Sequence, residues 1–194
     1  MDLDIKALNL WQQQVFGASL LQRMLPNYKY FSQATQFGNY NLLQNQMDII
    51  WQKLSLMPIK FSTEAQLNKL QDSIPNRLEF DIFAVYPAID VCSGLVSLIE
   101  SFDEKDTRCG QDLSLLSLNT VSCYIRLQLE QTDNDHDETS LKVMLEADPL
   151  FLWELETQQA LYNRVMKLNP SKQSAQNMRQ DVMQDGLTNL AIEY

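Results

Sequence analysis

The sequence predicts an all-α protein, a single-domain bundle of about eight or nine helices that spans residues 1–194. Apolar residues recur at helical spacing along most of the chain, and no segment shows the alternation that is typical of a strand. Only 5 glycines and 6 prolines are present, whereas sheet-rich folds need many turn residues. The hydrophobic fraction of 45% and the charged fraction of 21% indicate a globular chain with a full core.

The helices of the first part are delimited by proline and glycine. Residues 3–25 repeat apolar positions at helical spacing, and Pro26 breaks this pattern. Because proline is tolerated in the first turn of a helix, we expect Pro26 to open a second helix that runs to Phe37. Gly38 follows as a left-handed C-cap. A third helix is predicted over 40–56.

The next two helices begin at recognisable residues. Ser62 is a good N-cap, Glu64 suits the positive end of the helix dipole, and this fourth helix is expected to end before Ser73. Pro87 is expected to begin the fifth helix, which runs to about Phe102. The most informative part of the chain, Phe80–Cys92, leads into this helix.

Four more helices are predicted in the second half of the chain. An acidic, polar loop over 132–138 separates the first of them from the second, and Asp148 lies where the second ends. Leu152 is expected on the inner side of the third. The four helices cover 110–131, 139–147, 150–168 and 170–185.

The last helix and the segment after it have clear boundary signals. Asn169 is expected to be the N-cap and Pro170 the first helical residue, with Gly186 as the C-cap. The residues after Gly186 include Leu187, Leu190 and Ile192, which are too apolar for a free segment. We therefore expect this segment to dock on the body of the protein.

Charge and cysteine content exclude several classes of partner. The net charge of -10 argues against nucleic acid and against anionic membranes, which both attract basic surfaces. No apolar run reaches the ~18 residues that a transmembrane helix needs. Cys92, Cys109 and Cys123 are odd in number and lack zinc-site spacing, so reduced thiols in a cytoplasmic protein are expected.

The motifs of common catalytic and cofactor sites are incomplete. The loop that begins at Asp133 starts like a calcium-binding EF-hand, but its sixth residue is Glu138 instead of glycine, and its twelfth is Met144 instead of glutamate. His136 is the only histidine, which leaves no credible zinc site or catalytic triad. The glycines are too far apart for a phosphate-binding loop. We therefore expect no metal and no cofactor.

The run Phe80–Cys92 holds the remaining candidate site. Two carboxylates, Asp81 and Asp90, lie in this otherwise apolar run, and an unpaired buried carboxylate is costly. If the helix starts at Pro87, Asp90 lies in its first turn, where free amides stabilise a carboxylate. One interpretation is structural, with Asp90 hydrogen-bonded across a helix contact. The alternative is a ligand-binding site formed by Asp81, Tyr86 and Asp90.

The same helix carries a stripe of small and polar residues. Its members are Asp90, Ser93, Gly94, Ser97 and Ser101. The stripe is either a groove that a neighbouring helix enters closely or the lining of a pocket for a polar ligand. Structural use is the commoner role, because buried charges are normally paired.

Two stretches of the chain carry a resemblance to a known family. They are Arg23-Met24-x-Pro26-Asn27-Tyr28, followed by Phe31, Thr35 and Phe37-Gly38, and Phe80-Asp81, followed by Tyr86-Pro87-Ala88-Ile89-Asp90 and Cys92. Together they resemble the YjaG-like family of small bacterial proteins, a domain of unknown function, over most of the chain. The resemblance implies a helical, cytoplasmic protein and brings no activity, cofactor or catalytic residue. The chain departs from the expected pattern at Asn39, where an acidic residue is expected, and at Leu190-Ala191, where a glycine is expected.

The sequence does not identify an activity. We expect a non-enzymatic protein that acts by self-association or by binding a protein partner. The alternative is a small-molecule binder or an unrecognised enzyme with a polar site around Asp81, Tyr86 and Asp90. Metal-dependent chemistry through the acidic loop is the weakest hypothesis.

Overall fold

The computed structural model describes residues 3–103, 108–132 and 137–193, and its all-α architecture confirms the predicted fold class. Within these residues, β structure is limited to one bridge between Leu187 and Glu193. The α-helices are α1 (Leu10–Thr35), α2 (Tyr40–Leu54), α3 (Thr63–Leu70), α4 (Val85–Glu100), α5 (Cys109–Thr132), α6 (Glu138–Ala147), α7 (Pro149–Val165) and α8 (Lys172–Gln184). Short 3-10 helices are η1 (Ile5–Ala7), η2 (Gln71–Ser73) and η3 (Arg77–Glu79).

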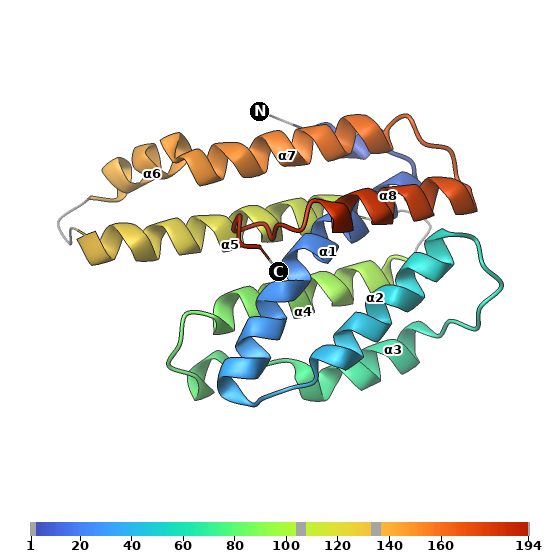
Figure 1. Cartoon of the computed structure of the whole chain (residues 1–194), viewed down its shortest axis with the longest axis horizontal. Coiled ribbons are helices and arrows are strands. Elements are labelled where there is room, and N and C mark those ends of the chain that lie inside the picture. Colours follow the sequence, from blue (N-terminus) through green and yellow to red (C-terminus); the bar gives the residue numbers. More distant parts are fainter. Residues whose placement is uncertain (1–2, 104–107, 133–136, 194) are drawn as a thin grey trace.

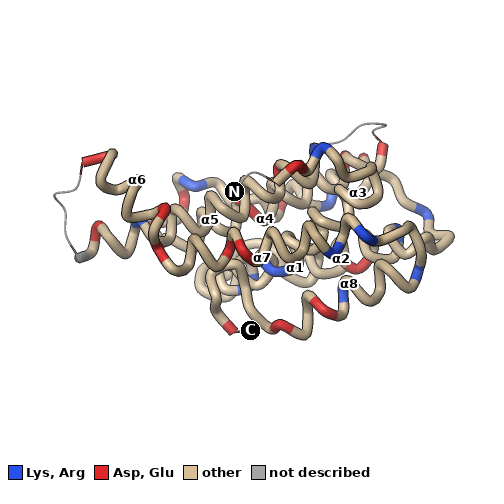
Figure 2. The backbone as a smooth tube through the Cα atoms, turned by 90° about the horizontal axis from the view of Figure 1, so that it is seen from above, with Lys and Arg blue, Asp and Glu red and all other residues tan. Residues whose placement is uncertain are grey.

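Helix α1 lies at the centre of the molecule. In Figure 1 it runs obliquely between α5, α6 and α7 on one side and α2, α3 and α4 on the other. It packs against α2, α4, α5, α7 and α8, and 18 of its 26 residues are buried. Its two charged residues are Arg23 and Lys29. Most of the charge shown in Figure 2 therefore lies on the helices that surround α1.

Pro26 does not end the first helix, so the predicted break at this residue is wrong. Helix α1 continues through Pro26 to Thr35. An interior proline removes one helical hydrogen bond and costs about 3 kcal/mol. Each large apolar side chain that becomes fully buried contributes about 1.5–3 kcal/mol, and Leu25, Tyr28 and Phe31 are all buried around this position. Packing of the second half of α1 therefore outweighs the proline.

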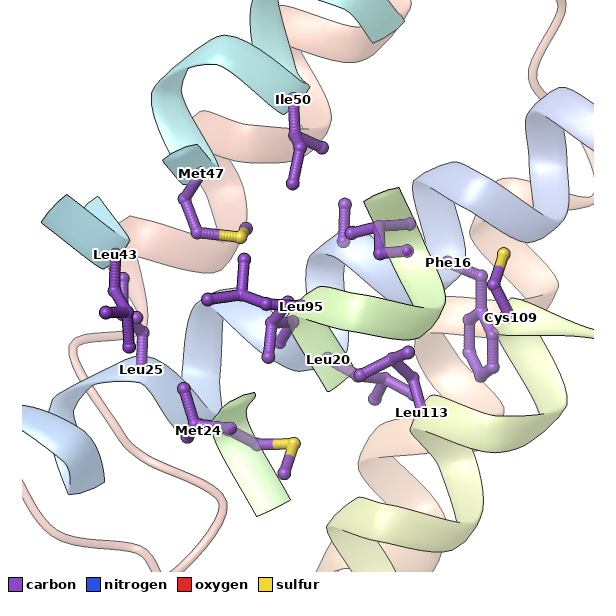
Figure 3. Close-up of a cluster of buried hydrophobic side chains, with 14 of the residues drawn as sticks. Phe16, Leu20, Met24, Leu25, Leu43, Met47, Ile50, Leu95, Cys109 and Leu113 are labelled. Atoms are coloured by element: carbon purple, nitrogen blue, oxygen red, sulfur yellow. The ribbon is translucent and has the colours of Figure 1, made fainter. Parts of the chain in front are cut away.

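The main core is an apolar cluster in which side chains of α1 meet those of α2, α4 and α5 (Figure 3), and a smaller cluster is formed by Val121, Ile125 and Leu190. Side chains of α1 and α5 pack tightly against Gly94 of α4. A Cβ atom at this position would lie 2.6 Å from Leu113 Cδ1 and 3.0 Å from Leu21 Cδ1. At Gly94, the small-residue stripe therefore serves as a close helix contact, which is the structural interpretation of that stripe.

Two predicted capping residues are replaced by their neighbours. The N-cap of α8 is Ser171 and not Asn169, because the Ser171 hydroxyl accepts a hydrogen bond from the backbone N–H of Ser174 at 3.0 Å. The left-handed C-cap of α1 is Gln36, and Gly38 adopts the left-handed conformation two residues later. Both corrections move a boundary by about two residues, which is the usual uncertainty of a helix end.

Helix α7 turns a polar edge toward the centre of the molecule, so the prediction for Leu152 is wrong. Leu152 is exposed, whereas Glu154, Gln158 and Tyr162 are buried. Since these residues follow one another at four-residue spacing, they lie on one face of the helix. The reason is Arg23 on α1, whose charge needs a buried partner.

Candidate functional site

Asp90 lies in the contact between α4 and α5. Helix α4 begins at Val85, so Pro87 is its third residue and Asp90 lies beyond the first turn, contrary to the prediction. The early start is permitted because the first N–H groups of a helix have no helical partner, so Pro87 removes no helical hydrogen bond. Asp90 Oδ2 instead accepts hydrogen bonds from Thr120 Oγ1 at 2.7 Å and from Asn119 Nδ2 at 3.4 Å. Burial raises the pKa of the Asp90 carboxyl, and these two hydrogen bonds partly offset that effect.

Asp81 and Tyr86 share a different location. Both line a shallow hollow of about 420 Å³ beside η3, together with Arg77. Arg77 Nε donates a hydrogen bond to the Tyr86 hydroxyl at 2.8 Å, and its guanidinium carbon lies 5.2 Å from the centre of the Tyr86 ring. Asp90 does not line this hollow. The structure thus brings two of the three predicted site residues together, and ligand binding by any of the three stays a prediction.

A larger cavity of about 630 Å³ lies beside this region, and we call it the tail pocket. We call residues 187–193 the C-terminal segment. The walls of the pocket come from the second half of α1, the segment 82–87, Tyr124 of α5, and residues 188, 190, 192 and 193 of the C-terminal segment. The carbon-rich residues that line it are Pro26, Tyr30, Ala34, Ile82, Phe83, Ala84, Pro87, Tyr124, Leu190 and Ile192. Polar groups come from Asn27, Lys29, Gln33, Thr188 and Glu193.

Two of the prolines that were expected to begin a helix, Pro26 and Pro87, both line the tail pocket. Pro26 lies inside α1 and Pro87 lies in the first turn of α4. The ring of Phe83 packs 5.9 Å from the ring of Tyr124, which joins the segment before α4 to α5. The pocket is therefore formed where α1, α4 and α5 meet. Three of its walls belong to, or lead into, helices that also form the core.

The C-terminal segment docks on the body, as predicted from its apolar residues. Leu190 is buried against Val121 and Ile125 of α5. The Thr188 hydroxyl accepts hydrogen bonds from the backbone N–H groups of Leu190 at 3.1 Å and Ile192 at 3.2 Å, so the segment forms a compact turn. Thr188, Leu190 and Ile192 of this turn face the tail pocket.

Asn189, between two pocket-lining residues, enters the protein interior. Its side chain is completely buried and accepts a hydrogen bond from Asn27 Nδ2 at 2.9 Å. Its own Nδ2 lies 3.1 Å from Ser117 Oγ and 3.3 Å from the Ser117 carbonyl oxygen. This asparagine therefore connects the C-terminal segment to both α1 and α5.

The hydrogen bonds continue from Ser117 to a buried ion pair. Ser117 Oγ donates to Glu154 Oε1 at 2.7 Å, and Arg23 Nη1 donates to Glu154 Oε2 at 2.8 Å. Gln158 Nε2 donates to Glu154 Oε1 at 2.9 Å. Arg23 Nη2 is buried and has no hydrogen-bond partner in the described part of the chain, and the guanidinium lies 5.0 Å from the Trp153 ring centre. A buried polar chain thus runs from the C-terminal segment through α5 to α7 and α1.

The two stretches that carry the family resemblance meet in the structure. The Tyr28 hydroxyl donates to the Ser73 carbonyl oxygen at 2.7 Å, and the Cys92 thiol points to the same oxygen at 3.7 Å. Burial raises the pKa of Tyr28 and of Cys92, each to about 12. Gly38 lies against Tyr28, since an added Cβ would overlap the tyrosine hydroxyl. Many residues of these stretches are therefore architectural.

Sequence reasoning missed the tail pocket and the Arg23–Glu154 pair. The pocket is assembled from four segments far apart in the chain, and spacing within the sequence contains no signal for it. Glu154 and Gln158 do lie four residues apart, and therefore on one face of a helix, which was a detectable sign of a polar helix edge. Their partners on α1 and α5 could not be identified in this way.

Metal clusters and membrane-spanning helices are both absent from the residues that the structure describes. These residues contain no group of three or more His, Cys, Asp or Glu side chains placed to hold a metal ion. They also include no helix that is long and apolar enough to cross a membrane. Residues 133–136 of the predicted acidic loop, including His136, lie outside the part that the structure describes.

Comparison with known proteins gives one consistent result. Residues 1–193 match a family described as "Protein of unknown function (DUF416)". The chain is 29% identical over 194 residues to the uncharacterized protein YjaG of Escherichia coli, a match that covers 99% of this chain and 95% of the relative. An uncharacterized protein of Haemophilus influenzae is also 29% identical, with 98% and 95% covered. The crystal structure of a DUF416 family protein from Shewanella baltica superposes with a TM-score of 0.87 at 31% identity, covering 98% of this chain and 96% of that chain.

Proposed function

Because the chain belongs to the DUF416 family, as its resemblance to YjaG implied, and the function of that family is unknown, we propose a function from the geometry. We propose that the protein binds a small, mainly apolar molecule in the tail pocket. The observation that carries this proposal is a cavity of about 630 Å³ whose walls are mostly carbon. Pockets for small molecules commonly enclose ~300–1,000 Å³ and combine apolar walls with a few polar groups.

Aromatic and proline rings supply the contact surface of the pocket. Tyr30, Phe83 and Tyr124 come from three different segments, and Pro26 and Pro87 present rigid rings between them. Such side chains offer a large apolar area and lose little conformational freedom on binding. A ligand with a flat or branched hydrocarbon body suits these walls.

Asn27 is the polar group that we expect to orient the ligand. Its amide nitrogen is engaged by Asn189, and its side-chain oxygen accepts no hydrogen bond from another described residue. The ammonium group of Lys29 lies 5.8 Å from the Tyr40 ring centre on α2. We therefore expect the ligand to carry one hydrogen-bond donor in addition to its apolar body.

A fluorescent probe and one substitution test the proposal. N-phenyl-1-naphthylamine is uncharged and becomes fluorescent when it leaves water, so it reports an apolar site. Ala34 is exposed and lines the pocket, so Ala34→Trp should fill the cavity without disturbing the core. We expect saturable probe binding to the wild type and a loss of at least tenfold in affinity for Ala34→Trp.

Ala160→Trp is the matched control, because Ala160 is exposed on α7 and does not line the pocket. It should bind the probe like the wild type. Equal binding by both tryptophan variants, or no saturable binding to the wild type, would contradict the proposal. A thermal-shift screen of metabolites then identifies natural candidates, since a ligand that binds only the folded state raises the melting temperature.

Self-association is a second candidate function, favoured by exposed apolar side chains next to the two hollows. Leu78 is 88% exposed, and Ile82, Tyr86, Tyr30 and Ile192 are exposed nearby. Exposed apolar side chains that gather in one region often mark a protein interface. In this non-enzymatic role, the partner is a second copy of the chain.

Light scattering coupled to size exclusion tests self-association. We expect the wild type to form a dimer at micromolar concentration and Leu78→Glu to shift the population to monomer. Met183→Glu on α8 is the control, because Met183 is also exposed but lies on another helix. A wild type that stays monomeric at all concentrations refutes this candidate. We also propose a cytoplasmic location for either role, which the three free cysteines support.

A further inference from the structure

One wall of the tail pocket is the C-terminal segment, which is far in the sequence from the segments that form the other walls. Thr188, Leu190, Ile192 and Glu193 line the cavity, whereas the neighbouring walls belong to helices or to the segment that leads into α4. In Figure 1 the segment leaves α8 and crosses the molecule close to α1 and α5. The cavity exists in its present form only while this segment is docked.

Docking of the segment depends on Asn189, which does not itself line the pocket. Its side chain is buried between Asn27 and Ser117 and makes three hydrogen bonds to them. Thr188 and Leu190, on either side of it, both face the cavity. The anchor and the wall are therefore adjacent residues of one short segment, so they move together.

We propose that Asn189 is the positioning residue of the tail pocket and that docking of the C-terminal segment regulates ligand binding at this site. The inference rests on the proposed function. A ligand that contacts Leu190 and Ile192 binds the docked form better than the undocked form. Ligand binding must then favour docking, and docking must favour ligand binding by the same factor.

Asn27 links the anchor to the ligand site directly. It lines the pocket, and it donates the hydrogen bond that Asn189 Oδ1 accepts. Loss of the anchor therefore frees the Asn27 amide as well as the pocket wall. The position of the proposed orienting group and the position of the wall change together.

The predicted size of the effect follows from the docked population. The apparent dissociation constant equals the intrinsic constant divided by the fraction of binding-competent protein. If Asn189→Ala lowers the docked fraction to about a tenth, the affinity for the probe falls about tenfold. Asn163→Ala, an exposed asparagine on α7, is the control and should bind like the wild type.

Two measurements on the full chain test the inference. The first is the affinity of N-phenyl-1-naphthylamine for the wild type, Asn189→Ala and Asn163→Ala. The second is amide hydrogen exchange of residues 187–193 with and without the probe, which reports docking even if Asn189→Ala lowers overall stability. We expect weaker binding and faster segment exchange in Asn189→Ala. We also expect slower segment exchange in the wild type when the probe is bound.

The outcomes separate this inference from the proposed function. If the wild type binds the probe and Ala34→Trp blocks it, but Asn189→Ala binds equally well, the inference alone is overturned. Segment exchange that the probe leaves unchanged in the wild type overturns it as well. If the wild type does not bind the probe, the proposed function fails and this inference fails with it.

Discussion

Replacing Glu154 by glutamine should destabilise the protein strongly, because it leaves Arg23 as an unpaired buried charge. The Arg23 and Glu154 side chains are 2% and 0% exposed, and Arg23 makes its hydrogen bond through Nη1 alone. The glutamine oxygen can still accept hydrogen bonds from Ser117 and Gln158. The glutamine amide nitrogen then faces Arg23 Nη1 donor to donor, so the buried cation loses its counter-charge and its one hydrogen bond together. Removal of one partner of a buried ion pair costs about 3–5 kcal/mol.

The assay is urea unfolding at pH 7 followed by circular dichroism. With a slope of about 3 kcal/mol per molar urea, this loss lowers the unfolding midpoint by about 1 M or more. Glu138→Gln is the control: Glu138 pairs with Arg126, and the two side chains are 82% and 41% exposed. Exposed pairs contribute about 0–1 kcal/mol, so the control should unfold close to the wild type.

A double variant separates the charge effect from loss of packing. Arg23→Met added to Glu154→Gln removes the unpaired cation and keeps an apolar stem of similar length. We expect it to recover part of the stability lost in Glu154→Gln, so the two effects are not additive. A loss below about 1 kcal/mol in Glu154→Gln, or strict additivity in the double variant, would refute the reasoning.

Three further predictions concern single residues. Burial raises the folded-state pKa of Asp90, so the stability that the protonated carboxyl contributes is complete below the unfolded-state pKa and is lost as pH rises through the raised pKa. The stability of Asp90→Asn relative to wild type, measured by urea unfolding, should therefore rise between pH 3 and 7, and a constant difference would contradict this. An aromatic disulfide reagent at pH 8 should modify the half-buried Cys123 first, and the buried Cys92 and Cys109 only after unfolding in urea; equal native rates for all three thiols would be inconsistent with their burial. Ala191→Gly should raise the melting temperature, because Ala191 has a φ of 55° and a left-handed alanine costs about 1–2 kcal/mol, whereas the extra flexibility that glycine gives the unfolded chain costs only about 0.4–1 kcal/mol. A lower melting temperature would disprove this.

Local features of the fold were predictable from the sequence because they depend on neighbouring residues. Ser62 caps α3 through the N–H of Ala65, and Gly38 and Gly186 both have positive φ. Asn39, where an acidic residue was expected, caps α2, a role that aspartate fills equally well. At Ala191, where a glycine was expected nearby, the backbone has the conformation that favours glycine.

The remaining features depend on contacts between distant segments. From the sequence alone, Pro26 predicts the end of a helix, because the contacts of α1 with distant segments that keep the helix intact are not visible there. Asp90 was correctly identified as a polar residue that needs a partner, but nothing near it in the chain points to Thr120. The sequence correctly grouped Asp81 with Tyr86, which line one hollow. It gave no indication of the tail pocket.

The central position of α1 has a consequence for the synthesis of the protein. Asn27 and its partner Asn189 are 162 positions apart, and translation at about 5–20 residues per second takes about 8 to 30 s to cover that distance. The helices that enclose α1 are made one after another during this time, and residues 187–193 are made after all the described helices. Among the described helices, α1 therefore waits longest with its core-forming side chains unpacked, and transiently exposed apolar surface of this kind makes a partly folded chain prone to aggregation. Native packing around α1 can be completed only after residues 187–193 have been released from the ribosome.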